Sequence, residues 1–379
     1  MVSGKNAGKL EINSARLNNL AISSATLLNP RQLVKENSGF RVDEITGKYN
    51  DSINRLTWQN ASYDKSSKLF SIHSFSYRPA LSKEEFMASQ PYQADYTMLQ
   101  TGLVTAGPFD IDRYLSDTVI DAGTISIHDF VMEDFRDKRM PLQKGIIKPL
   151  PVNMLKQIPF RFSSDLVVFN NANIQYSEVN EKNNQTGVIR INRLNGSVSS
   201  INNYSYQPGD SLRINAKAYL MDSVHTTLQV NESYTDSLAG FLMTASISPA
   251  DPKILNPVLM PLTSIQVVSG YVDTLFMSVV GKEHIAMGEM KMYYHDLKIK
   301  LLNNNPGSKK SSGKGFLSFL ANTLIKNKNT SRSGAIFFER FRNRSVLNYL
   351  VKITLSGVGS SVGVKSNKKQ VRRHKKELR

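Results

Sequence analysis

Cysteine is absent from the 379-residue chain, and tryptophan occurs once, at Trp58. Disulfides and thiolate metal sites are therefore excluded, and a chain without thiols is compatible with an oxidising compartment. A secretory signal is not visible either, because Met1 is followed by polar residues and then directly by a strand-like pattern. A signal peptide needs a basic start and an apolar core. We therefore expect the chain to begin inside a β-repeat of a longer protein.

Motifs that would carry catalysis or bind a metal ion are also missing. None of the six histidines forms an HxxxH or HExxH pair, and no G-x-S-x-G elbow occurs. The stretch from Asp110 to Asp121 is not a calcium loop, because Leu115 stands where glycine is expected. GSKKSSGKG, from Gly307 to Gly315, has five residues before its Gly-Lys pair, whereas a phosphate loop has four. The sequence predicts a non-enzymatic protein without a cofactor or metal.

Positive charge is concentrated at one end of the chain. The formal net charge is +17, yet residues 308–379 hold 18 Lys and Arg against two acids, Glu339 and Glu377. The preceding 307 residues are close to neutral, with 30 basic and 29 acidic residues. This is a neutral body with a basic end that suits phosphate-bearing partners, either nucleic acid or anionic lipid.

Alternating apolar residues are the main pattern of the body. The clearest set is Leu212, Ile214, Ala216, Ala218 and Leu220, with polar or aromatic residues between them. Period-two alternation places such a set on one face of a strand. Polar, turn-prone clusters separate these segments and favour antiparallel neighbours over βαβ units. We predict a mainly β fold: a long, curled antiparallel sheet that forms a taco-like groove, with a few short helices mostly near the C-terminus.

Several predicted strands change phase partway. Apolar alternation slips between Ile12 and Leu17, between Ile191 and Leu194, and around His295-Asp296. A slip of one residue turns every later side chain to the other face, and a β-bulge corrects it while increasing the twist. Repeated slips in long strands therefore predict a strongly curved sheet.

Helical patterns are few. They cover residues 82–90, which start with a Ser82–Glu85 capping box, residues 151–158, the first part of 251–265, residues 315–326 and residues 345–358. We predict four segments: a curled β-sheet body over 1–302, a flexible linker over 303–315, amphipathic helices and a short strand over 316–364, and a disordered basic tail over 365–379.

The basic tail has no aromatic residue, which a nucleic-acid site would need for base stacking. Amphipathic segments lie upstream of it, as in proteins that contact membrane surfaces. A solvated solubility tail is the remaining interpretation. Residues 345–364 contain Lys352 and many small residues, which indicates an amphipathic helix on the sheet end or a membrane surface and not a transmembrane span. The candidate residues for contact with an anionic membrane are Lys368, Lys369, Arg372, Arg373, Lys375 and Lys376.

Four segments carry a resemblance to a known family. The stretch from Arg139 to Glu178, with its Pro-rich lead-in and its Asn-x-x-Ile-x-Tyr-x-Glu ending, resembles the central region of AsmA-like proteins of Bacteroidota. GVIRINRLNGSVSSINN (187–203) resembles the strand pair that follows, residues 269–303 resemble the C-terminal repeat, and residues 343–358 resemble the closing helix. The resemblance covers roughly residues 120 to 360.

The resemblance implies a curled sheet with a hydrophobic concave face, related to bridge-like lipid-transfer proteins. Such proteins are anchored in the inner membrane by an N-terminal helix, which this sequence does not show, and extend through the periplasm. Their proposed role is phospholipid passage towards the outer membrane, or outer-membrane assembly. The resemblance implies no catalytic residues. It leads us to expect a periplasmic protein associated with the inner membrane.

We therefore expect a groove that binds phospholipid or another acyl-chain lipid and meets a membrane surface. An apolar sheet face must be covered, and few helices are predicted to cover it. The alternative is a β-scaffold that binds another envelope protein through a sheet edge. Nucleic-acid binding through the tail is the least favoured hypothesis. The groove candidates are Leu166, Val168, Ile174, Leu212, Ile214, Leu220, Leu228, Met290 and Met292.

Overall fold

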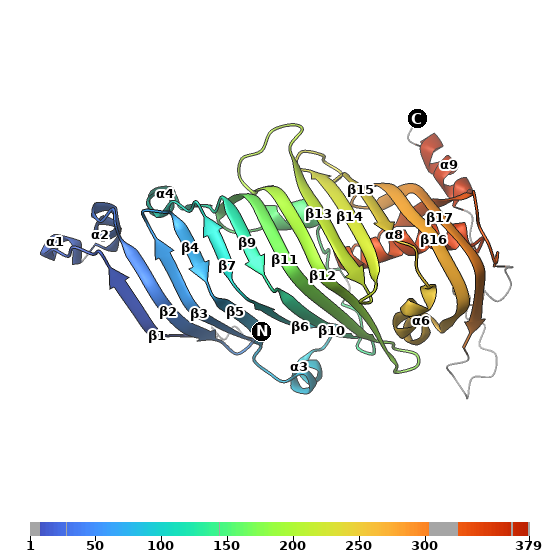
Figure 1. The fold of residues 1–379 in the computed structure, drawn as a ribbon, viewed down its shortest axis with the longest axis horizontal. Coiled ribbons are helices and arrows are strands. Elements are labelled where there is room, and N and C mark those ends of the chain that lie inside the picture. The colour runs from blue at the N-terminus through green and yellow to red at the C-terminus, as the bar shows by residue number, and fades with distance from the viewer. Residues whose placement is uncertain (1–7, 28, 144, 303–324, 365–366, 378–379) are drawn as a thin grey trace.

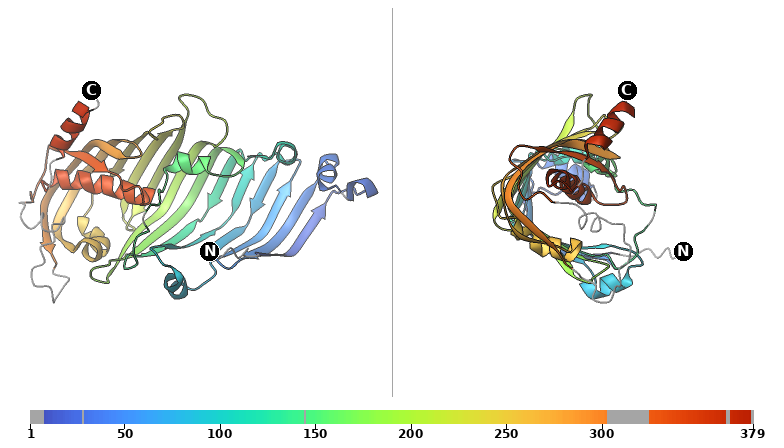
Figure 2. Two further views of the ribbon diagram at one scale, coloured as in Figure 1. Left: turned by 180° about the vertical axis from the view of Figure 1, so that it is seen from behind. Right: turned by 90° about the vertical axis from the view of Figure 1, so that its right-hand side faces the viewer.

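The computed structural model describes residues 8–27, 29–143, 145–302, 325–364 and 367–377. Within these residues the chain forms one sheet of 18 strands that curls along its length (Figure 1). Viewed from its end, the sheet is C-shaped, and helix α8 (Val346–Ser361) lies inside the curl (Figure 2). The prediction of a mainly β fold with a long, curled sheet is confirmed.

The first part of the sheet is built from short strands that lie end to end. β3 pairs with both β4 and β5, β7 continues the line of β6, and β8, β9 and β10 all pair with β11. The strands are β1 (Lys9–Asn18), β2 (Arg41–Asn50), β3 (Asn54–Asp64), β4 (Leu69–Ile72), β5 (Ser74–Pro79), β6 (Asp95–Thr101), β7 (Val104–Gly107), β8 (Val119–Asp121), β9 (Thr124–His128) and β10 (Val131–Asp137).

The second part is an antiparallel meander in which each strand pairs with the next. Four of its strands are long, and they form the hairpins β11–β12 and β16–β17. The strands are β11 (Arg161–Val179), β12 (Thr186–Asn202), β13 (Ser211–Leu220), β14 (Val224–Ser233), β15 (Phe241–Ile247), β16 (Ile265–Gly281), β17 (Ile285–Leu301) and β18 (Ser333–Glu339).

The sheet is mixed, which corrects the prediction of a purely antiparallel one. β8, β9 and β10 run parallel to β11. Parallel neighbours need a long crossover. Residues 138–160, which include helix α5 (Pro151–Lys156), supply it. The sequence shows this segment as a Pro-rich lead-in before a strand, but turn-prone clusters elsewhere favoured an antiparallel chain throughout.

The predicted phase slips are β-bulges. Asp296 and Arg193 have positive φ values of 52° and 49°, and the strand pairs shift register beside them. β1 shifts register against β2 between Ile12 and Arg16. A further bulge at Asn171, with φ 57°, lies inside β11 and was not predicted. These bulges let long strands keep one apolar face while the sheet curls.

Apart from α8, the helices are short, and they lie along the rims of the sheet, at its ends or inside the curl (Figure 1). Ser82 and Glu85 form the predicted capping box of α3. Pro261 lies inside α6. The bounds of the helices not yet given are α1 (Ser24–Leu27), α2 (Pro30–Glu36), α3 (Lys83–Ser89), α4 (Ile111–Asp117), the 3-10 helix η1 (Pro252–Leu255), α6 (Asn256–Thr263) and α9 (Lys368–Glu377).

The predicted segment boundaries change in two places. The sheet does not stop at residue 302, because β18 pairs with β17. Most of the predicted tail is helix α9, which packs on the sheet through a ring contact of 6.2 Å between His374 and Phe337. Its charge density predicted disorder, but a tertiary contact is present that composition cannot reveal. The predicted linker 303–315, and residues 316–324 of the helix expected after it, lie outside the described residues.

Helix α8 closes the main core at the C-terminal end of the curl. Its buried residues include Tyr349 and Ile353, which are 1% and 0% exposed. They pack with Met290 and Ile336 of the sheet, both 0% exposed. Gly357 is required beside them, since a Cβ there would lie 2.7 Å from the Met290 methyl carbon. The helix is therefore an integral layer of the fold.

Replacing Ile353 by valine should lower the free energy of unfolding by about 1 kcal/mol, because it removes one methylene from a fully buried contact. Leu355 of the same helix is 38% exposed, so Leu355→Val is the matched control and should cost less. Urea denaturation of both variants measures the difference. Equal losses would show that α8 does not pack as described.

Candidate functional site

Register identifies the side chains that line the inside of the curl. Residues directly opposite each other in neighbouring strands share a face. Met290 opposes Met277 and contacts α8, so the face that carries both is the concave one. The same face can be followed from pair to pair across the sheet to β1. In the first eleven strands its apolar side chains include Leu10, Ile12, Ile45, Trp58, Phe70, Ile72, Phe75, Leu99, Val104, Ile125, Ile127, Met132, Val167, Phe169 and Ile174.

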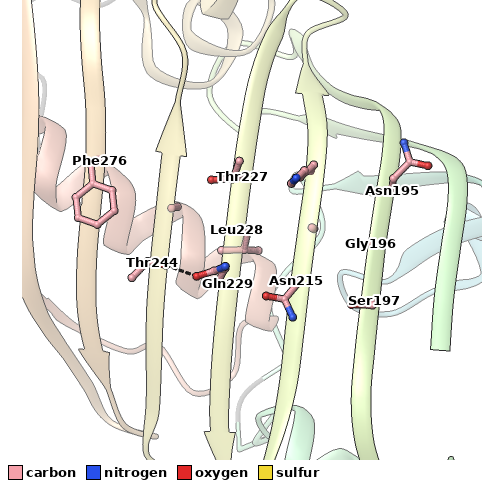
Figure 3. Close-up of a pocket in the computed structure, with 12 residues that line it drawn as sticks. Asn195, Gly196, Ser197, Asn215, Thr227, Leu228, Gln229, Thr244 and Phe276 are labelled. Carbon is pink, nitrogen blue, oxygen red and sulfur yellow. Dashed lines mark hydrogen bonds between the residues drawn. The ribbon is translucent and has the colours of Figure 1, made fainter. Parts of the chain in front are cut away.

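The convex face carries mostly polar side chains over the first strands, whereas on β15 and β16 it also carries the exposed apolar residues Leu242, Phe276 and Val280. Ser126 opposes Thr105, and Thr57 and Ser76 share a hydrogen bond of 2.5 Å. A shallow depression on this face is lined by polar side chains that include Asn215, Gln229 and Thr244 (Figure 3). The sheet therefore separates an apolar interior surface from an exterior that is mainly polar over the first strands and mixed over β15 and β16.

Exposure of the concave face falls along the molecule. Leu10, Ile12 and Leu17 of β1 are 60%, 57% and 56% exposed. The concave side chains from β2 to β10 named above are half-buried. The helices inside the curl, α5, α6 and α8, contact strands from β11 onward (Figure 2). The result is an apolar groove that is open over the first strands and filled by helices at the other end.

Seven of the nine predicted groove residues lie on the concave face. Ile174, Ile214, Leu220 and Leu228 are half-buried on the concave face. Leu212, Met290 and Met292 are also concave but are 2%, 0% and 6% exposed, so they belong to the core beneath the helices.

The assignment of Leu166 and Val168 to the groove was wrong. They oppose Ser199 and Ser197 and lie on the convex face. The bulge at Asn171 inverts the phase of β11, so Val167 and Phe169 point inward before the bulge and Ile174 points inward after it. The prediction assumed an unbroken period of two across residues 166–176, which is incompatible with that inversion.

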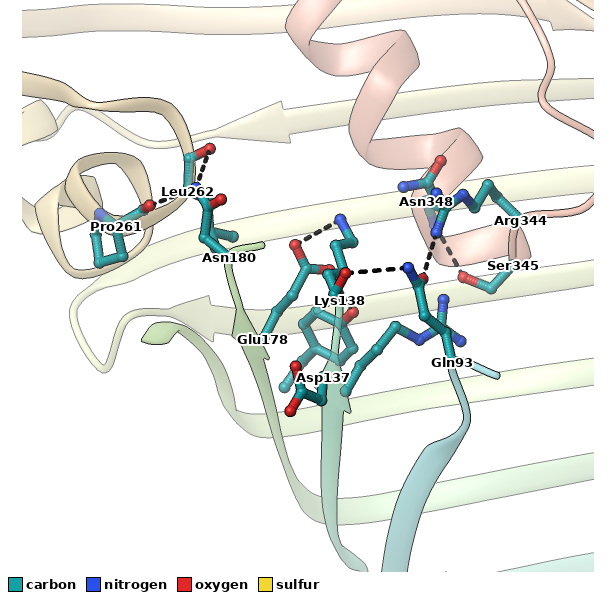
Figure 4. A network of polar contacts seen from close by, with 12 residues as sticks. Gln93, Asp137, Lys138, Glu178, Asn180, Pro261, Leu262, Arg344, Ser345 and Asn348 are labelled. Atoms are coloured by element: carbon teal, nitrogen blue, oxygen red, sulfur yellow. Dashed lines mark hydrogen bonds and ion pairs between the residues drawn. The ribbon is translucent and has the colours of Figure 1, made fainter. Parts of the chain in front are cut away.

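One group of charged residues interrupts the apolar interior where β10 and β11 end (Figure 4). Arg136 makes two hydrogen bonds of 2.5 Å to Asp95, and Lys138 lies 2.5 Å from Glu178. Tyr176 donates a hydrogen bond of 2.7 Å to Glu178. We call the charged members the interior charged cluster: Asp95, Asp134, Arg136, Lys138, Lys148, Glu178, Arg344 and Lys352.

Burial changes the ionisation of this cluster. It raises the pKa of Asp134 and of the neighbouring Tyr176, because the charged forms lose solvation. It also lowers the pKa of Lys352; the positive charges of Lys138 and Arg344 add to that effect, and the carboxylate of Glu178 opposes it. No motif marked these residues, because their roles depend on contacts between segments far apart in the sequence.

The predicted membrane-contact residues fall on α9, at the C-terminal end of the sheet (Figure 1). The structure therefore gathers Lys368, Lys369, Arg372, Arg373, Lys375 and Lys376 on one short helix beside β18. No helix in the described part of the chain is long and apolar enough to cross a membrane. Among the same residues, no group of three or more His, Asp and Glu side chains is placed to hold a metal ion.

A scan against protein-family models and a search of curated proteins found no match for this chain. The class of protein is therefore defined by the geometry. It is a curled β-sheet protein with an apolar interior groove, closed at one end by α8.

Proposed function

We propose that the protein binds phospholipid acyl chains in its groove and conducts them between membranes of the cell envelope, or supports outer-membrane assembly. The observation that carries the proposal is the apolar concave face of β1 to β10, which is half-buried or exposed. A surface of this kind is an aggregation hazard unless an apolar partner covers it. Acyl chains match it because they are flexible, apolar and need no hydrogen bonds.

Two further observations support a membrane setting. Helix α9 carries six cationic side chains, and each Lys or Arg near an anionic bilayer contributes about 1 kcal/mol. The resemblance to AsmA-like proteins favours a periplasmic location next to the inner membrane, with phospholipid as the cargo. The mainly polar convex face of the first strands suits a surface that stays in water while the interior holds lipid.

Native mass spectrometry of the purified protein, followed by lipid extraction, tests the proposal. We expect co-purifying phospholipid, and faster transfer of a fluorescent phospholipid between donor and acceptor vesicles when the protein is added. A protein that carries no lipid and transfers none would refute it.

A scaffold that binds another envelope protein through a sheet edge is the second candidate, and the two edges of the sheet differ in a way that favours it. On the outer edge of β18, Phe337 N–H donates to Ser356 Oγ at 3.2 Å, and Asn367 Nδ2 donates to the Ala335 carbonyl at 2.8 Å. Among the described residues, the outer edge of β1 has no comparable cover. An uncovered strand edge accepts another strand.

A photoreactive amino acid at Arg16, on the convex side of β1, distinguishes the two candidates. The scaffold function predicts one dominant crosslinked protein and no bound lipid. Lipid in the purified protein, without a dominant crosslink, favours the groove function.

A further inference from the structure

Helix α8 carries three different surfaces. Tyr349, Ile353 and Gly357 are buried against the sheet. Leu347, Val351 and Leu355 are 43%, 39% and 38% exposed, although all three are apolar. Arg344, Asn348 and Lys352 follow one another at intervals of four residues, so they line one side of the helix start, between the other two surfaces.

The polar side of α8 faces the ends of β10 and β11 (Figure 4). Arg136 lies opposite Glu178 on the concave side, and alternation places Lys138, which pairs with Glu178 at 2.5 Å, on the same side. Lys148, from the crossover, lies 3.8 Å from Asp95. The interior charged cluster therefore holds five cations against three carboxylates, and its excess charge is positive.

Two of these cations have no acidic partner. Arg344 donates a hydrogen bond of 2.9 Å to the neutral Gln93 side chain. Lys352 makes no ion pair within the described residues, although the charges of Lys138, Glu178 and Arg344 all act on it. The one carboxylate that acts on this partly buried ammonium, Glu178, is already paired with Lys138, so a further anion would stabilise the site.

A buried guanidinium lies against the same crossover. Arg340 is 7% exposed and donates one hydrogen bond of 2.6 Å to the Lys148 carbonyl. Its Nε and Nη1 have no partner among the described residues. The charges of Glu283 and Glu232 act on Arg340, but neither carboxylate accepts a hydrogen bond from these two atoms. Buried donors of native proteins are nearly always satisfied, so a further acceptor would stabilise this guanidinium.

The cluster lies where the open groove ends. Towards the N-terminus the interior is apolar, with Met132 and Ile174 directly beside the charged residues on β10 and β11. Towards the C-terminus α8 fills the curl. An amphiphile in the open groove would therefore meet apolar side chains along most of its length and a cluster of cations at this point.

We propose that the interior charged cluster binds the phosphate of a phospholipid headgroup. The acyl chains then lie along the open groove and along the exposed apolar stripe of α8, which consists of Leu347, Val351 and Leu355. This inference rests on the proposed function and adds a location and a headgroup class to it. Lys and Arg both bind phosphate through charge-assisted hydrogen bonds. Within the described residues, Arg344 and Lys352 are the members of the cluster whose cationic groups form no ion pair with a carboxylate.

The test uses the full chain incubated separately with vesicles that contain phosphatidylglycerol and vesicles that contain diacylglycerol, which shares the acyl chains but lacks phosphate. Native mass spectrometry measures the bound lipid. The double variant Arg344→Gln, Lys352→Gln should bind at least tenfold less phosphatidylglycerol and keep its diacylglycerol. Arg213→Gln, Lys217→Gln on the convex face of β13 is the matched control and should keep both lipids.

Each outcome separates the two proposals. A wild-type protein that takes up neither lipid refutes the groove function. Equal loss or equal retention of both lipids in the double variant refutes the headgroup site and leaves the groove function intact. Inorganic phosphate provides a further test. If it binds tightly to the lipid-loaded protein and displaces none of the lipid, the cluster is a site for free phosphate, and the inference is refuted. Lys138→Gln is a second variant, and thermal melting checks that each variant is folded.

Discussion

Aspartate in place of Ile127 or Phe169 is expected to reduce the lipid bound by the purified protein at least tenfold. The two side chains oppose each other on β9 and β11, face the concave side and are half-buried. An ionised carboxylate there would have to lose water when an acyl chain lies across it, which costs several kcal/mol. Because about 1.4 kcal/mol is a tenfold change in affinity, the loss should be large. Lipid extraction and vesicle transfer measure it.

The adjacent residues provide the controls. Ser126 and Val168 also oppose each other on β9 and β11, but they face the convex side. Ser126→Asp and Val168→Asp should therefore leave bound lipid unchanged. Val168→Asp is the sharper control, because simple alternation in the sequence placed Val168 in the groove. Lipid loss in Val168→Asp, with retention in Phe169→Asp, would overturn the register-based assignment of the groove.

Alternation and its slips were enough to predict a long, curled, mainly β fold from the sequence. The slips around Arg193 and Asp296 were visible because apolar residues on both sides changed phase. The bulge at Asn171 was not visible, since β11 carries apolar residues on both faces around it, including Val167 and Val168. Register errors of one residue follow directly from such two-sided patterns.

The interior charged cluster could not be predicted for a different reason. Arg136 and Glu178 are neighbours only because β10 runs parallel to β11, and Lys352 joins them only because α8 folds back into the curl. Neither contact leaves a local trace in the sequence. The sequence predicted α8 as an amphipathic helix. It did not show that the helix has two apolar surfaces, one buried through Tyr349 and Ile353 and one exposed, because that division depends on how the helix packs.

Glu232 is expected to make the stability of the protein depend on pH. The side chain is 1% exposed on the concave side of β14, and its Oε1 accepts a hydrogen bond of 3.2 Å from the Val152 N–H of α5. Burial raises its pKa from 4.5 to about 7, against the opposing effects of the Val152 N–H, Arg340 and Lys156. Between these two values the folded chain keeps a proton that the unfolded chain releases. Stability therefore falls as the pH rises through this interval, and the loss is complete above about pH 7.

Replacing Glu232 by glutamine should remove this dependence, because the amide keeps an acceptor for Val152 and carries no charge. The pKa rise corresponds to roughly 3 kcal/mol, so the variant should be more stable than the wild type by roughly 2 to 3 kcal/mol at about pH 8 and by less than 1 kcal/mol at about pH 5. The attraction of Arg340 and Lys156 is already contained in the pKa of Glu232, so it does not reverse the sign. Urea denaturation at both pH values measures the effect, with Glu289→Gln on the exposed convex side of β17 as the control. A Glu232→Gln variant that is less stable at about pH 8 would show that the carboxylate is held ionised by a stronger pairing than the one to Val152, and Arg340, whose charge lowers the pKa of Glu232, is the candidate for it.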